Sequence, residues 1–220
     1  MTHATLKSRH RAVRDGYPPN LNLRLHRALS WLARAEAAEQ AGDLDGRFIF
    51  LWIAFNAAYA RDIDERQGLS EQATFIDFLE QLCAIDHGRL DDLVWREFSG
   101  GIRVLLDTPY VFQAFWDWHA GRISQAEWES RFAKGKQLAQ QALARGKTPE
   151  ILGLVFTRLY TLRNQLVHGG ATWGSRVNRK QLRDCGNLLG KFVPLMLELM
   201  LDHPEVDWGA ACYPVVEQDA

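Results

Sequence analysis

The segment Tyr160–Gly170, YTLRNQLVHGG, places an arginine, an asparagine and a histidine at the end of an apolar stretch. Histidine is suited to proton transfer near neutral pH because its unperturbed pKa lies in that range. Arginine stays protonated, and its planar guanidinium can hold two oxygens of one oxyanion. Arg163, Asn164 and His168 are therefore candidates for proton transfer beside a bound anion.

A helix must position these side chains. The Thr-Pro pair at residues 148–149 is typical of an N-cap followed by a first helical turn, and it predicts a helix that ends at Gly169. At about 100° per residue, Asn164 and His168 share one face a turn apart. Arg163 lies about 140° from His168, so its long side chain must swing toward that face.

The end of this helix also suits a histidine that exchanges protons. Unpaired carbonyls in the last turn favour the charged imidazole of His168, and Gly169 and Gly170 let the chain leave sharply. His168 is the only histidine with an arginine five to seven positions before it. The alternative is a purely structural role, because arginine, histidine and glycine are common at helix ends without any catalysis.

Composition limits the other classes of function. The 220 residues include 26 Lys and Arg against 27 Asp and Glu, so no global field attracts nucleic acid, and any anion site must be local. The three cysteines, Cys83, Cys185 and Cys212, have no zinc-ligand spacing and are predicted to be reduced thiols. We expect no metal and no cofactor, because the sequence contains no metal-binding motif and no phosphate-binding glycine loop; it also lacks a nucleophile elbow.

The same composition indicates a cytoplasmic protein without a membrane association. The N-terminal residues carry positive charge but lack the apolar core of a secretory signal. The longest apolar run, Phe48–Ala60, is interrupted by Asn56 and is shorter than the ~20 residues that span a bilayer.

Helical patterning covers most of the chain and predicts an all-α, multi-helix bundle. The approximate ranges of the expected helices are 22–41, 44–60, 70–86, 90–106, 109–120, 124–144, 148–169 and 178–200. Phe48–Ala60 is apolar on nearly every side, which predicts a central helix packed all round. Ser70 and Asn178 are expected to cap two of the helices, and Pro194 to kink or break the last one.

We predict one domain over residues 20–201. An irregular basic segment, residues 1–19, precedes it, and a tail, residues 202–220, follows it. No linker or repeat divides the chain.

The motif RNQLVHGG resembles the R-x4-6-H motif of the HEPN domain, in which Asn, Asp or His often follows the arginine and the motif lies on a late helix of an α-helical bundle. The segment FIFLWIAFNAAYARD resembles an apolar helix of some bacterial HEPN-like proteins. The resemblance implies a HEPN-like bundle with a helical insertion at about 69–147.

HEPN proteins of this kind are commonly metal-independent ribonucleases that act as toxins, antiviral effectors or RNA-processing enzymes. The resemblance implies that Arg163 and His168 are catalytic and that Asn164 assists them. RNA carries its own nucleophile, the 2′-hydroxyl, so the expected products are a 2′,3′-cyclic phosphate and a 5′-hydroxyl. The implied partners are RNA, a second copy that shares the active site, and an antitoxin or a nucleotidyltransferase. No DNA or membrane partner is expected.

Two further groups are weaker candidates. A basic group after the glycines could guide RNA to the site, or could simply be the solvated start of a helix; it comprises Arg176, Arg179, Lys180 and Arg183. Trp116, Trp118 and His119 could stack on bases, although core packing is the interpretation we favour.

Two other functions stay open beside the ribonuclease. A HEPN module that binds nucleotide or RNA without cutting would carry the same motif, and so would a helical scaffold in which Arg163 and His168 are structural.

Overall fold

The computed structural model of the protein describes residues 1–60, 71–176 and 178–213, and over these ranges the chain forms helices and no strand. The predicted all-α bundle is confirmed. The α-helices are α1 (His3–Val13), α2 (Pro19–Gln40), α3 (Leu44–Tyr59), α4 (Glu71–Ile85), α5 (Arg89–Asp92), α6 (Ser99–Leu106), α7 (Gln113–His119), α8 (Gln125–Arg145), α9 (Thr148–Val167) and α10 (Arg179–Asp202). None of the described helices is long and apolar enough to cross a bilayer.

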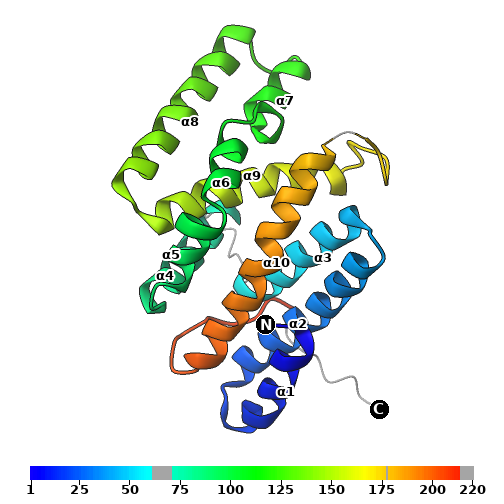
Figure 1. The fold of residues 1–220 in the computed structure, drawn as a ribbon, viewed down its shortest axis with the longest axis vertical. Helices are drawn as coiled ribbons and strands as arrows, with labels where there is room; N and C mark the ends of the chain where they lie inside the picture. The colour runs from blue at the N-terminus through cyan, green and yellow to red at the C-terminus, as the bar shows by residue number, and fades with distance from the viewer. Residues whose placement is uncertain (61–70, 177, 214–220) are drawn as a thin grey trace.

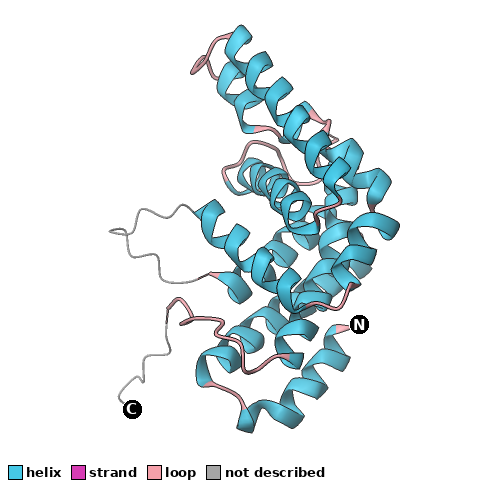
Figure 2. Cartoon of the chain, turned by 90° about the vertical axis from the view of Figure 1, so that its left-hand side faces the viewer, coloured by secondary structure: helices cyan, strands magenta, loops and turns pink. Residues whose placement is uncertain are grey.

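The helices form two groups that meet at α9 (Figure 1). In the first group, α2 and α3 pair, α10 packs on both, and α1 covers α2 and α10. In the second group, α4, α6 and α8 pack against α9. The α7–α8 hairpin projects from the bundle at the top of Figures 1 and 2.

Aromatic side chains fix α9 against α3 and α10. The rings of Phe55 and Phe156 are 4.5 Å apart, and those of Phe156 and Phe192 are 4.8 Å apart. In the second half of α9, the ring centroid of Tyr160 lies 6.1 Å from that of Trp52. These buried contacts hold the helix that carries Arg163 in the middle of the molecule, so its C-terminal end has a fixed position.

Only part of α3 is surrounded by other elements. Phe48, Trp52 and Phe55 are fully buried, but Ile49 and Ile53 stay partly accessible to solvent. Ala57 continues this line at the same spacing of four residues. This apolar stripe on α3 is only partly covered, so the prediction of a helix packed all round holds for the other sides of α3 and not for this one.

The N-terminal residues are not irregular as predicted. They form α1, which Thr2 caps by accepting a hydrogen bond from the backbone N–H of Thr5. Leu6 and His10, one turn apart, are both buried against the bundle. Burial of this face provides the stabilisation that the short polar helix lacks by itself.

The segment after α10 also packs on the bundle as far as Tyr213. Trp208 is buried, and the fully buried Arg24 donates to the carbonyls of Gly209 (3.2 Å) and Ala210 (2.6 Å). Arg27 donates to the carbonyl of Tyr213. Two arginines of α2 thus hold this segment by its backbone.

Three predicted helices differ in detail. The range 90–106 is interrupted by a π-helical turn at Leu93–Glu97, and the α-helix resumes as α6 only at Ser99. Pro109–Val111 is a 3₁₀ turn, η4, and α7 starts only at Gln113. Pro194 does not break α10, because the buried residues around it hold the helix in place. Ser70 lies outside the described residues.

Candidate functional site

The two glycines end α9 as the sequence predicts. His168 is the C-cap, and Gly169 takes a left-handed φ of +70°. The N–H of Gly170 donates to the carbonyl of Gln165 (2.7 Å), and the N–H of Gly169 donates to that of Leu166 (3.2 Å), which together make a Schellman motif. A Cβ on residue 170 would lie 2.9 Å from the Gln165 carbonyl oxygen, so this close turn requires glycine.

Arg163 and Asn164 are in direct contact. The Nη1 of Arg163 donates to Oδ1 of Asn164 at 2.9 Å, and the guanidinium carbon lies 5.7 Å from the ring centroid of Tyr160. Since the amide oxygen of Asn164 faces the guanidinium, its NH₂ group is directed elsewhere and has no acceptor among the described residues. The pair therefore presents two kinds of donor, guanidinium and amide, on one part of the helix surface.

The side chain of His168 is open to solvent. It is exposed, and it makes no hydrogen bond or ion pair with any residue in the described ranges. Its backbone N–H donates to the carbonyl of Asn164 at 3.0 Å, which fixes the position of its Cα one turn beyond Asn164. The imidazole can therefore turn toward a ligand held by Arg163 and Asn164 without breaking a contact.

The structure separates Arg179 from the other members of the predicted basic group. Both η nitrogens of Arg179 donate to the carboxylate of Asp45, at 2.6 and 2.7 Å, and the N–H of Gly174 donates to the same carboxylate. This bidentate pair fastens the loop after α9 to the start of α3, so Arg179 is occupied and we withdraw it from the predicted RNA-binding group. The remaining members, Arg176, Lys180 and Arg183, are all exposed.

Asn178 has a different role from the predicted cap. It precedes α10 with a left-handed φ of +58°, but its side chain makes no capping hydrogen bond. Instead its Nδ2 donates to Oε1 of Gln165 at 2.9 Å. The Nε2 of Gln165 in turn donates to the carbonyl of Tyr110 at 2.7 Å.

Gln165 was missed by sequence reasoning, although it stands inside RNQLVHGG. It connects the end of α9 to the loop before α10 and to η4. Only its polarity at a position between Asn164 and His168 hinted at this connecting role.

The aromatic candidates lie on the α7–α8 hairpin. Trp116 and Trp118 are partly buried, and His119 is exposed. Trp118 stacks on Trp128 of α8, with ring centroids 6.2 Å apart and planes 6° apart. The favoured interpretation, packing in the bundle core, was therefore wrong. These rings pack against other aromatic residues of α7 and α8, on a hairpin that projects from the bundle.

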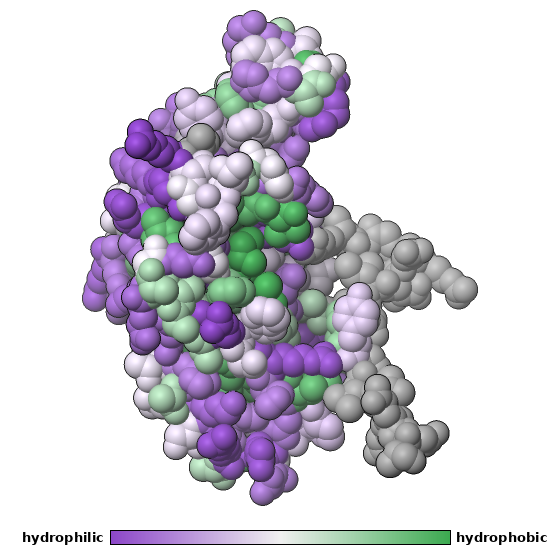
Figure 3. All heavy atoms as spheres, turned by 90° about the vertical axis from the view of Figure 1, so that its right-hand side faces the viewer, coloured by the Kyte–Doolittle hydropathy of each residue, from purple (hydrophilic) through white to green (hydrophobic). Residues whose placement is uncertain are grey.

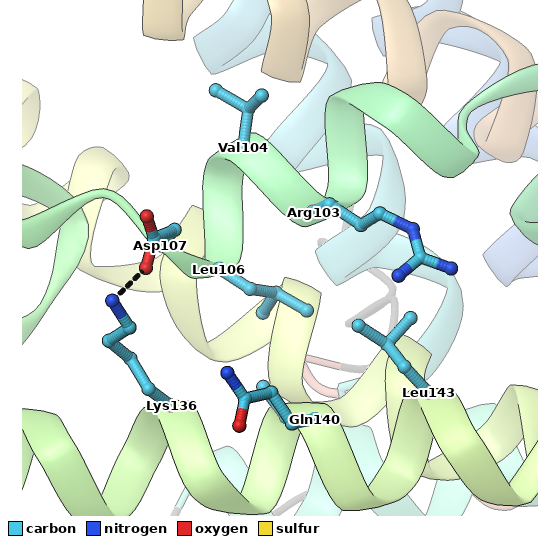
Figure 4. Close-up of a pocket in the computed structure, with 8 residues that line it drawn as sticks. Arg103, Val104, Leu106, Asp107, Lys136, Gln140 and Leu143 are labelled. Atoms are coloured by element: carbon cyan, nitrogen blue, oxygen red, sulfur yellow. Dashed lines mark ion pairs between the residues drawn. The ribbon is translucent and has the colours of Figure 1, made fainter.

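A cleft of about 480 Å³ between α6 and α8 lies apart from the motif (Figure 4). Lys136 and Asp107 form an ion pair at its edge, and the side chains of Leu106 and Gln140 point into it. None of the predicted catalytic residues lines this cleft.

No cluster of three or more His, Cys, Asp or Glu side chains suited to a metal ion occurs in the part of the chain that the structure describes. Comparisons of the chain with protein-family models, with curated proteins and with solved structures gave no match.

Proposed function

We propose that this protein is a metal-independent endoribonuclease of HEPN type, with Arg163, Asn164 and His168 as its catalytic residues. The observation that carries the proposal is the 2.9 Å hydrogen bond between Arg163 and Asn164, next to an exposed histidine at a glycine-terminated helix end. The two side chains provide donors for phosphate oxygens, and the histidine provides a proton carrier beside them.

The proposed reaction is transfer of the phosphodiester to the neighbouring 2′-oxygen. That oxygen loses its proton and bonds to phosphorus, the bond from phosphorus to the 5′-oxygen breaks, and the leaving 5′-oxygen gains a proton. Arg163 would hold the non-bridging oxygens as negative charge develops, and the Asn164 amide would donate to one of them. His168 would carry one of the two protons.

One copy of the motif supplies one proton carrier, whereas the reaction needs an acceptor and a donor. A two-fold dimer would place two copies of His168 around one phosphate. The face on the right of Figure 1, where α9 ends and α3 begins, has apolar surface in its middle (Figure 3). On these helices Val167 is 54% exposed, and Ile49 and Ile53 are partly accessible. We propose this face as the dimer interface.

The dimer predicts the effect of a charge on the α3 stripe. Ile53→Lys should convert a dimer into a monomer and lower the specific cleavage activity at least about tenfold, because a desolvated lysine opposes association. Light scattering measures the mass, and thermal melting checks folding. Leu138→Lys, at an apolar residue that is 49% exposed on α8, is the matched control and should leave mass and activity unchanged. A wild-type monomer with full activity would contradict the shared site.

The chemistry predicts that cleavage needs the 2′-hydroxyl and no metal. Purified protein should cut a single-stranded RNA equally well with and without EDTA, because the proposed catalysis uses only side chains. The same strand with 2′-deoxyribose at the cleaved nucleotide should stay intact, since the nucleophile is missing. Gel analysis of end-labelled strands measures both. Loss of cutting in EDTA, or cutting of the deoxy strand, would overturn the proposed mechanism.

A further inference from the structure

Tyr110 lies beside the candidate catalytic helix end although it is more than fifty residues away in sequence. Its carbonyl accepts two hydrogen bonds, from Nε2 of Gln165 (2.7 Å) and from Nε1 of Trp116 (2.8 Å). Its side chain is nevertheless 47% exposed. An aromatic residue is thus fixed by its backbone to the motif while its ring faces solvent.

The ring is also held from within the same segment. The rings of Tyr110 and Phe115 meet edge to face, with centroids 5.4 Å apart and planes at 86°. This contact with Phe115 reduces the freedom of the Tyr110 ring before any ligand binds, and such preorganisation lowers the entropy cost of binding.

The position of Gln165 places Tyr110 relative to His168. On α9, Gln165 precedes His168 by three residues and so lies about 60° from it, whereas Asn164 lies about 40° away on the other side. His168 is therefore flanked by the Arg163–Asn164 pair on one side and by the Gln165–Tyr110 contact on the other.

We propose that Tyr110 stacks on a nucleobase of single-stranded RNA next to the scissile phosphate, and that Gln165 is the residue that positions it. The proposal rests on the proposed ribonuclease function and adds a base-binding subsite to it. Unpaired bases of RNA are commonly bound on aromatic faces, and such stacking tolerates different bases because each has a π face. Tyr110 would therefore orient the strand with little preference for sequence.

The test measures binding of 12-nucleotide RNAs in which 2-aminopurine occupies one position at a time. All proteins carry His168→Ala, so that the RNA stays intact during the measurement. The variants added to it are Tyr110→Leu, which keeps apolar bulk without an aromatic face, and Tyr110→Phe, which keeps the face. Tyr213→Ala, at an exposed tyrosine near the far end of the chain, is the matched control.

We expect Tyr110→Leu to raise the Kd about tenfold or more and to remove the quenching of 2-aminopurine at one position. Tyr110→Phe and Tyr213→Ala should keep both the Kd and the quenching, and all variants should melt alike. Equal binding and equal quenching in Tyr110→Leu would overturn the stacking role. So would the absence of RNA binding by every protein.

A double-mutant cycle tests the positioning role of Gln165. Gln165→Glu replaces the donor to the Tyr110 carbonyl by an acceptor, so it should weaken binding and quenching when Tyr110 is present and have no further effect with Tyr110→Leu. Additive effects would contradict the coupling. Cleavage is measured separately with proteins that retain His168. Normal cleavage without any stacking on Tyr110 would refute only the stacking role of Tyr110. Stacking without cleavage would refute only the proposed nuclease activity.

Discussion

His168→Ala is expected to lower the rate of RNA cleavage by about 10²–10⁴-fold, because the variant loses a proton carrier in the transition state. The melting temperature should stay near that of the wild type, since the His168 side chain is exposed and makes no hydrogen bond with a described residue. Single-turnover cleavage of labelled RNA and thermal melting monitored by circular dichroism measure the two quantities.

The matched control for this variant is His26→Ala, at an exposed histidine on α2. It should cleave at the wild-type rate. If His168→Ala cleaves like the wild type, His168 has no role in chemistry. If it unfolds, the histidine is structural, as the scaffold alternative holds.

Arg163→Lys should lower kcat by about 10²-fold, although the positive charge is kept. Lysine cannot present two parallel N–H groups to phosphate oxygens, and its ammonium cannot reproduce the guanidinium geometry seen beside Asn164 and Tyr160. Steady-state kinetics separate the effect on kcat from that on KM. The loss should fall mainly on kcat, because the developing charge on the phosphate is greatest in the transition state.

Arg11→Lys, at an exposed arginine on α1, controls for general loss of a guanidinium group. It should leave the cleavage rate unchanged, because Arg11 belongs neither to the candidate site nor to the predicted RNA-binding group. Full activity in Arg163→Lys would contradict the idea that Arg163 clamps the phosphate through two hydrogen bonds.

Local sequence patterns were sufficient to predict the main helices and the end of α9. The two glycines end that helix through the Schellman hydrogen bonds, which join residues close together in the sequence. At the start of the helix the prediction of a Thr148 cap was wrong, because Lys147 is the N-cap and the Thr148 hydroxyl donates to the distant Asp91. The swing of Arg163 toward Asn164 was also predictable, because a side chain of that length can span the angle between neighbouring positions.

Contacts between distant residues could not be predicted in the same way. The ion pair of Arg179 with Asp45 and the hydrogen bond of Gln165 to Tyr110 join residues that are 134 and 55 positions apart. Nothing in the neighbouring sequence identifies either pair. A polar or charged residue at a helix end is taken to be solvated unless its partner is known. The basic group and the aromatic segment were therefore assigned without knowing which members were occupied.

The ends of the chain show the same limitation. Residues 1–19 are polar enough to read as irregular, yet the burial of Leu6 and His10 stabilises a helix there. The segment around Gly209 has little regular structure, yet Arg24 holds its carbonyls. In both cases the stabilising partner lies on another helix, so the sequence of the segment alone could not predict its packing.

The central claim, RNA cleavage through the 2′-hydroxyl at the end of α9, is tested most directly by identifying the new ends of the products. Mass spectrometry of a defined RNA digested by wild-type protein should show 2′,3′-cyclic phosphate and 5′-hydroxyl ends, and His168→Ala prepared in parallel should give neither. Products with 3′-hydroxyl and 5′-phosphate ends, or the same products in equal amounts from His168→Ala, would contradict the assignment of this site.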